Sequence, residues 1–299
     1  MAGLKEIKRR LRSVKNTQKI TYAMKLVSAA KLRKAQEAVT KSREYTTELG
    51  ALLSQLLQET AGTELSHPLM EVRPEVKNVA LLVVGGQRGL CGGYNSNVNK
   101  KVEVAQKQFS DLRSSVVLGK KPAEYYRRKG MSYLNAFEEL PENANAWPIA
   151  DIASELETGF RSGAFDEVWV IYTKFKSAIS QTVQLEKLLP LDANLSALSV
   201  SAAKTAASSV SESGGVTKFE PSAIAVFSSL LPRIVSAKIR QFCLDAKASE
   251  TAARMTSMDA ATKNAKQLSR KLELQHNKIR QARITSELLD ILGGAEAVK

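Results

Sequence analysis

Cysteine and histidine, the side chains on which most metal and redox sites depend, are scarce in this sequence. Its 299 residues include 2 cysteines and 2 histidines. Cys91 and Cys243 lie far apart, and neither has a second thiol or a histidine close to it in the sequence. A disulfide framework or a structural zinc site needs several such residues at short spacing. We therefore expect two structural thiols, no metal and no cofactor.

Long apolar runs are also missing. No stretch of about eighteen apolar residues could cross a bilayer. Residues 1–16 alternate charged with apolar side chains, whereas a secretory signal peptide needs a continuous apolar segment. We expect a soluble chain that stays in the cytosol.

Glycine and proline are both absent from Arg233 to Leu292, where apolar and small residues recur at heptad-like spacing. The predicted seam consists of Met258, Ala261, Ala265, Leu268, Leu272, Ile279, Ala282 and Leu289, with Gln275 as an interruption. A helix of this length would extend roughly 90 Å, about three times the diameter of a small domain. We therefore expect it to pair with another helix and to be surrounded by other chains.

A second uninterrupted stretch, Leu4 to Leu49, predicts another helix of about 70 Å. Its predicted apolar stripe consists of Leu4, Ile7, Leu11, Val14, Ile20, Met24 and Val27 and, after a run of small residues, Tyr45, Leu49, Leu52 and Leu56. An antiparallel coiled coil of the two terminal helices would bury both stripes.

The middle of the chain follows a different pattern. The continuous apolar run Val79–Val84 predicts a strand that is buried on both faces. Further strands are expected at 115–118, 132–137, 167–174 and 179–185, and helices at 94–109, 122–129 and 148–160. Strands that alternate with helices and end in a hairpin predict an α/β fold, with a mostly parallel sheet and an antiparallel edge.

These patterns predict four parts. They are an N-terminal coiled-coil helix (1–61), an α/β domain (75–191), a flexible connection rich in serine and alanine (192–218) and a C-terminal coiled-coil helix (219–299).

The net charge of +14 is concentrated in the predicted terminal helices. Residues 1–44 carry 13 basic and 3 acidic side chains, and residues 233–292 carry 12 and 6. One interpretation is a helix surface that faces water or an acidic protein partner. The alternative is a nucleic-acid-binding coiled coil, although aromatic residues for base stacking are scarce on these helices.

The glycine-rich stretch Gly85–Gly93 is the most suggestive motif, because it follows a strand and leads into a helix where backbone N–H groups could hold a phosphate. It lacks the lysine and serine of a P-loop, and it does not fit the dinucleotide-binding pattern. A tight structural turn is the favoured interpretation, and a dinucleotide-binding enzyme is the alternative.

Other catalytic patterns are absent from the sequence. His67 falls in a linker and His276 on a helix, where each is expected to be solvated or to cap a helix, and no nucleophile motif or paired carboxylates occur. We expect no enzyme activity from this chain alone.

Four blocks, Ile7–Gln36, Arg88–Val98, Ala252–Ala265 and Asn277–Ala295, resemble signatures of the γ subunit family of F-type ATP synthase, bacterial type. They occur in the family's order and span nearly the whole chain. The resemblance implies a Rossmann-like α/β domain carried by a long antiparallel coiled coil. It also implies a non-catalytic rotor shaft that couples c-ring rotation, driven by H⁺ or Na⁺, to conformational change in the catalytic β subunits.

The resemblance further implies the partners and the location. The partners would be the α3β3 hexamer, the ε subunit and the c-ring, with no nucleic acid. The membrane would be reached only through the complex, so the chain would be peripheral, at the cytoplasmic face of the cell (inner) membrane. Thiol control is not expected, because the cysteine pair that is inserted in chloroplast relatives is missing.

Individual contact residues follow from the same resemblance. Contacts with the α3β3 ring are implied for Met24, Lys25, Arg254, Gln281, Thr285 and Glu287. Foot contacts with the c-ring and ε are implied for Phe219, Glu220 and Pro221. The chain departs from the family at Gly86-Gln87, where a Ser-Asp pair is usual, and at Arg283 and Ser286, so contacts at these positions can differ.

Overall fold

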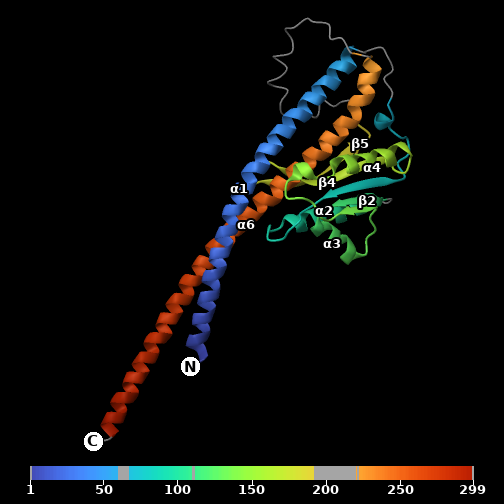
Figure 1. Ribbon diagram of the computed structural model, residues 1–299. Helices are drawn as coiled ribbons and strands as arrows, with labels where there is room; N and C mark the ends of the chain where they lie inside the picture. The colour runs from blue at the N-terminus through green and yellow to red at the C-terminus, as the bar shows by residue number, and fades with distance from the viewer. Residues whose placement is uncertain (1, 60–66, 110–111, 192–219, 221, 298–299) are drawn as a thin grey trace. The chain divides into compact units, whose positions relative to one another are not determined.

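The computed structural model describes residues 2–59, 67–109, 112–191, 220 and 222–297. The chain divides into two compact units. Unit 1 combines Met1–Ala30 with Arg254–Lys299, and unit 2 is Lys31–Ala253. Two long helices, α1 (Ala2–Glu59) and α6 (Ala223–Ala297), contribute residues to both units (Figure 1).

The long terminal helices confirm the expected fold class, but α6 begins before the expected run. It starts at Ala223 and continues through Pro232, whereas the proline-free run begins at Arg233. A proline inside a helix removes one backbone hydrogen bond. Burial on both sides of Pro232 offsets that loss, since Phe227, Leu231 and Ile234 are each at most 1% exposed. Tertiary packing therefore overrides the local preference.

The two helices run antiparallel within each unit. In unit 1 the Lys25 ammonium lies 2.6 Å from Asp259, and Lys15 lies 2.6 Å from Glu273, so position increases on one helix as it decreases on the other. In unit 2, Arg43 lies 2.7 Å from Asp245.

The composition of the seam differs from the prediction in unit 1. Ile20 and Val27 are 60% and 55% exposed, while the neighbouring Thr21 and Ser28 are buried. The expected position Leu268 is likewise about half exposed, and Ser269 is buried in its place. In unit 2, the expected positions Tyr45 and Leu52 are also about half exposed. The buried Thr21 is tolerated because its hydroxyl donates to the Gln18 carbonyl of its own helix. The half-buried Thr262 likewise donates to the Met258 carbonyl.

Unit 2 contains a five-stranded sheet in the order β3-β2-β1-β4-β5. The strands are β1 (Val79–Val84), β2 (Leu112–Leu118), β3 (Asn135–Phe137), β4 (Glu167–Phe175) and β5 (Gln181–Leu189). β1 pairs in parallel with β2 and β4, β2 pairs in parallel with β3, and β4 and β5 form an antiparallel hairpin. This confirms the predicted parallel sheet with an antiparallel edge.

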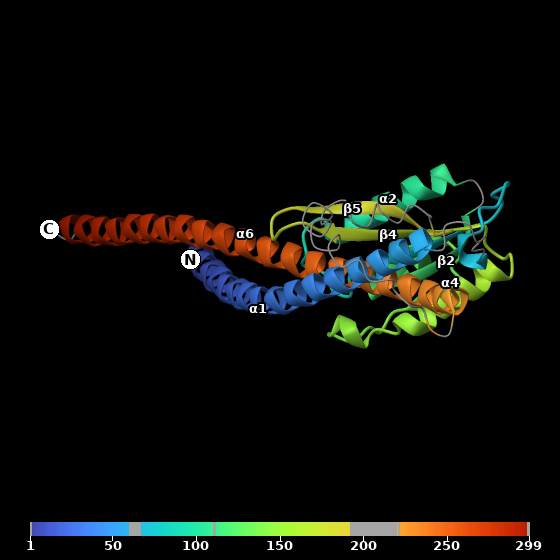
Figure 2. The same ribbon diagram turned by 90° about the horizontal axis from the view of Figure 1, so that it is seen from above.

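Helices cover both faces of the sheet (Figures 1 and 2). The side chains of α2 (Tyr94–Gln108) and α3 (Lys120–Lys129) share one core cluster with Leu81, Val83 and Ile171. Because side chains alternate along a strand, Tyr172 points to the opposite face. There the centroid of its ring lies 4.4 Å from the ring centroid of Phe242 in α6. The connection from β3 to β4 contains α4 (Ile149–Arg161), and a right-handed crossover between these parallel strands places α4 on this second face as well.

The expected connection 192–218 lies outside the described residues, and the four-part domain division stays a prediction. Two short 3-10 helices, η1 (Pro68–Met70) and η2 (Ala144–Ala146), precede β1 and α4. Across the described ranges, no helix combines the length and the apolar character that a membrane crossing requires.

Candidate functional site

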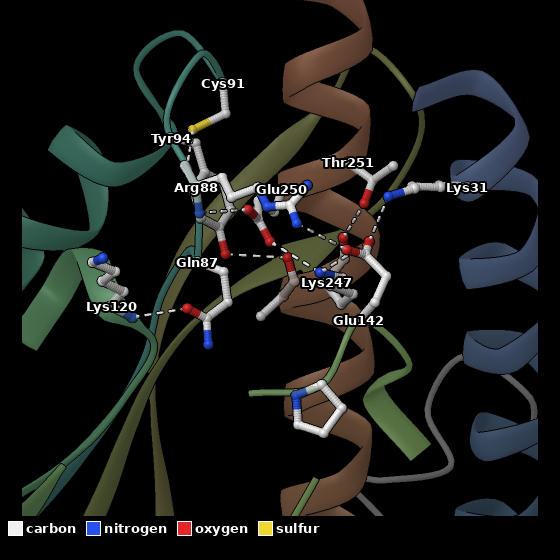
Figure 3. A network of polar contacts seen from close by, with 12 residues as sticks. Lys31, Gln87, Arg88, Cys91, Tyr94, Lys120, Glu142, Lys247, Glu250 and Thr251 are labelled. Carbon is white, nitrogen blue, oxygen red and sulfur yellow. Dashed lines mark hydrogen bonds and ion pairs between the residues drawn. The ribbon is translucent and has the colours of Figure 1, made fainter. Parts of the chain in front are cut away.

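A polar network in unit 2 joins α1, α6 and the glycine loop Gly85–Gly93, and Figure 3 shows these side chains converging. Glu142 lies at its centre: its carboxylate is 3.0 Å from Lys31, 3.7 Å from Lys247 and 3.9 Å from Arg88. Partial burial acts to raise the pKa of Glu142, but the hydrogen bond from Lys31 and the surrounding positive charges outweigh burial and lower it. Glu142 therefore stays ionised and connects three separate segments.

Glu250 on α6 is the buried acid of this network. Glu250 is 3% exposed. Its carboxylate accepts a hydrogen bond from the backbone N–H of Arg88 at 3.3 Å and lies 3.6 Å from the Lys247 ammonium. Tyr94, at the start of α2, donates its hydroxyl to the Ala246 carbonyl of α6 at 3.1 Å. The glycine loop is thus attached to α6 by both backbone and side-chain contacts.

The start of the glycine loop, from Gly85 to Gln87, is held in a tight turn by contacts from its own chain. Gly85 donates its N–H to the Leu118 carbonyl, and the Gly86 carbonyl accepts from Lys121. A Cβ on Gly85 would lie 2.7 Å from the Pro122 ring, so the start of α3 packs directly against the loop backbone here. This geometry supports the structural interpretation of the motif.

Gln87, one of the departures from the family pattern, has a polar role in this turn. Its amide nitrogen donates to the Glu138 carbonyl at 2.8 Å, and its amide oxygen accepts from the backbone N–H of Lys120 at 3.3 Å. Lys120 is the first residue of α3, whose initial N–H groups have no partner within the helix. Gln87 therefore links the glycine loop to the start of α3 and to the end of β3.

Both thiols are buried, as expected for structural cysteines. Cys91 accepts a hydrogen bond from the Asn95 amide at 3.2 Å, and burial raises the pKa of Cys243. A raised pKa suppresses the reactive thiolate. His67 accepts from the backbone N–H of Leu69 and so caps η1, and burial lowers its pKa. No group of three potential metal ligands occurs within the part of the chain that the structure describes.

In unit 1, the predicted contact residue Lys25 already has an acidic partner on α6. Asp259 lies 2.6 Å from Lys25 and 2.8 Å from Lys263. The hydrogen bonds from these two ammonium groups lower the pKa of Asp259 to about 2, and the same contact raises the pKa of Lys25. Met24, next to Lys25 in α1, and Arg254, five residues before Asp259 in α6, are each half-buried. The structure thus places Met24, Lys25 and Arg254 in the same stretch of the helix pair.

The helix α6 changes character after Ile279, its last half-buried residue. We call residues 280–292 the tip; every tip residue except 290, whose side chain is not described, is exposed. The predicted contacts Gln281, Thr285 and Glu287 all lie here, and Glu287 pairs with Arg283 at 2.7 Å. The exposed large apolar residues of the tip are Ile284, Leu288, Leu289, Ile291 and Leu292.

A second exposed apolar group lies on α1 and was missed in the sequence. It consists of Ile20, Tyr22, Leu26 and Val27, each at least half exposed. Two of these residues had been assigned to the seam. The signal that could have placed them outside is the polar series Gln18, Thr21 and Ser28, which continues from Val14 in steps of 4, 3 and 7 residues along one helix face.

The predicted foot is only partly described. Glu220 is exposed, while Phe219 and Pro221 lie outside the described residues.

Comparisons with known proteins place the chain among similar sequences over its whole length. A model of the ATP synthase family matches residues 3–298. The ATP synthase gamma chain of Heliobacterium modesticaldum is 40% identical over 301 residues, and that of Bdellovibrio bacteriovorus is 38% identical over 303 residues. Each comparison covers 100% of both chains.

Solved structures agree in fold. A chain of the Euglena gracilis mitochondrial ATP synthase OSCP/F1/c-ring structure aligns with a TM-score of 0.65 at 16% identity, covering 99% of this chain and 95% of that one. A chain of the Tetrahymena thermophila mitochondrial ATP synthase central stalk/c-ring structure aligns with a TM-score of 0.56 at 22% identity, covering 81% and 99%.

Proposed function

Because the chain belongs to the ATP synthase gamma chain family, we propose that it is the central rotor shaft of an F-type ATP synthase. In this role it couples rotation of an ion-driven c-ring to conformational change in the catalytic β subunits. The chemistry belongs to the β subunits, and this chain transmits torque without a catalytic site of its own. Its partners are the α3β3 hexamer, the ε subunit and the c-ring.

The tip is the observation that carries this proposal. It is a helix that has no intrachain cover and yet bears five large apolar side chains. Contiguous exposed apolar surface on a soluble chain marks a site of interaction with another protein. A shaft whose end lies inside a ring of subunits is expected to have such a surface, because the ring subunits cover the apolar side chains that the shaft's own chain leaves exposed.

The contact residues are proposed on the same basis. Toward the ring we place Met24, Lys25, Arg254, Gln281, Thr285 and Glu287. Of these, Lys25 is paired with Asp259, so its charge is partly neutralised before any partner approaches. Toward the c-ring and ε we place Phe219, Glu220 and Pro221. The chain then lies at the cytoplasmic face of the cell membrane, and it is held there by the complex.

The test is coexpression of this chain with the α, β and ε subunits from the same cell, followed by reconstitution with the membrane sector in vesicles. We expect one copy of the chain per α3β3 hexamer and ATP-driven ion pumping that depends on its presence. A fully coupled complex that forms without the chain would contradict the proposal.

Single substitutions refine this test. Thr285→Ala and Glu287→Ala are expected to lower the rate of ATP hydrolysis by the complex severalfold, because they remove polar contacts made by the tip. Gln267→Ala serves as the control, since Gln267 is an exposed residue of α6 outside the proposed contacts.

A further inference from the structure

The guanidinium of Arg43 joins three elements of unit 2. From α1, its Nη2 donates to the Asp245 carboxylate of α6 at 2.7 Å and to the Phe175 carbonyl, at the end of β4, at 2.8 Å. These partners lie 202 and 132 positions away in the sequence. One side chain therefore fixes α1 simultaneously to the other long helix and to the sheet.

Asp245 is buried much more deeply than its partner. Its side chain is 3% exposed, against 44% for Arg43. Its second oxygen accepts from the Gln241 amide at 3.1 Å. Burial raises the pKa of Asp245 despite the adjacent Arg43 charge, so the pair is not an optimal source of stability. A buried ion pair of this kind fixes the relative position of the two helices, because the planar guanidinium holds its N–H groups in fixed directions.

The same stretch of β4 is held to α6 by two further contacts. The ring centroids of Tyr172 and Phe242 lie 4.4 Å apart, and the Ser249 hydroxyl donates to the Thr173 carbonyl at 3.0 Å. α6 is thus attached along β4, and Arg43 adds α1 to this attachment.

The packing of α1 immediately beside Arg43, between the buried Leu32 and Leu49, uses short side chains. The buried seam residues beside it are Val39, Ser42 and Thr46. These side chains are short, so they interlock less deeply with the facing helix than leucine or phenylalanine side chains would. Directional hydrogen bonds at Arg43 therefore add to the buried Leu49, Leu53 and Leu56 in fixing the rotational position of α1.

We propose that Arg43 and Asp245 are a positioning pair, which holds α1, α6 and β4 in one rotational register so that torque passes between the helix pair and the sheet without slip. The inference rests on the proposed function as a rotor shaft. It concerns the efficiency of coupling and not the chemistry of ATP hydrolysis.

The test compares variants in the complete membrane-bound complex. Arg43→Met is expected to retain ATP hydrolysis while the number of ions pumped per ATP falls about twofold or more. Arg43→Lys is expected to give an intermediate ratio, because lysine keeps the charge but its ammonium rotates freely and does not fix the directions of its hydrogen bonds. Arg33→Met is the matched control on the same helix, since the Arg33 side chain is 86% exposed and, among the described residues, its ion pair is with Glu37, four residues along α1.

A double variant separates positioning from stability. Arg43→Met with Asp245→Leu replaces the ion pair with apolar side chains, a change that often preserves or raises stability. We expect this variant to assemble and to hydrolyse ATP, yet to remain poorly coupled. Wild-type coupling in the double variant would overturn the proposal. A wild-type complex that hydrolyses ATP without pumping would overturn the proposed function instead.

Discussion

At the scale of single residues, Asp166 shows how a buried carboxylate stabilises unit 2. One oxygen accepts from Arg73 at 2.7 Å, and the other accepts from the backbone N–H groups of Lys77 and Asn78 at 2.8 and 2.7 Å. Burial acts to raise the pKa of Asp166, but these hydrogen bonds and the Arg73 charge outweigh it and lower the pKa below its usual 3.8. The contacts tie the segment before β1 to the start of β4.

Asp166→Asn is therefore expected to destabilise the protein by about 1.5–3 kcal/mol at pH 7, the range for hydrogen bonds to charged groups. A lowered folded-state pKa contributes stability that is present above the unfolded pKa and is lost as pH falls through the folded pKa. The difference between wild type and variant should thus disappear in acid, below pH 3.8. Denaturant unfolding at a series of pH values measures it.

Glu139→Gln is the control for this experiment, because Glu139 is an exposed acid on the same unit. A destabilisation by Asp166→Asn that stayed constant from pH 7 into acid would show that the carboxylate charge is not the source of the stability.

At the scale of elements, the join between β2 and α3 depends on Gly119. This residue has φ +107, and a Cβ there would lie 2.7 Å from the Gly85 carbonyl oxygen. The backbone conformation and the close approach both require glycine. The glycine loop and the start of α3 are consequently packed backbone against backbone.

Gly119→Ala is expected to cost about 1–3 kcal/mol of stability, the usual cost of a residue held in a sparsely populated backbone region. Gly89→Ala is the matched control, because no atom lies within 4 Å of a Cβ at Gly89 and its φ is not in the left-handed region. Thermal unfolding of the two variants compares them directly. Equal melting temperatures would contradict the assigned role of Gly119.

The strands and short helices were predictable because their signals are local. The apolar runs Val79–Val84 and Val168–Tyr172 each identify a strand without reference to the rest of the chain. The seam of unit 1 was not predicted correctly. Apolar periodicity pointed to Ile20 and Val27, but Thr21 is buried instead, because its hydroxyl is satisfied by its own helix.

The polar network and the positioning pair could not be predicted for a different reason. Arg43 and Asp245 are 202 positions apart, and Glu142 meets Lys31 and Lys247 from a loop with no recognisable motif. Such pairs are set by the antiparallel register of α1 and α6 and by the docking of the sheet. The sequence contains the charges, but local patterns do not specify which of them meet.

At the scale of the whole molecule, the chain on its own leaves apolar surface uncovered. The tip and the α1 group of Ile20, Tyr22, Leu26 and Val27 leave large apolar side chains open to water. Burial of such side chains against a partner contributes about 25 cal/mol per Å². The isolated chain is therefore expected to be less soluble than its net charge of +14 alone would suggest.

Replacing Leu288 and Leu292 by serine is expected to raise the solubility of the isolated chain and to weaken its incorporation into the α3β3 complex. Sedimentation of the free chain and copurification with the ring measure the two effects. Leu268→Ser is the control, because Leu268 is 47% exposed on α6 but lies outside the tip. Unchanged incorporation of the double variant would argue against a ring contact for this part of the tip.

The two hydrogen bonds of the Gln87 side chain restrict which residue types are compatible with this position. An amide both donates to the Glu138 carbonyl and accepts from the Lys120 N–H. A carboxylate, as in the Ser-Asp pair usual for the family, can accept from position 120 but would face the carbonyl of position 138 with a second acceptor. Because the acceptor at position 138 is a main-chain carbonyl that every residue type carries, an acid at position 87 requires the segment after β3 to follow a different path.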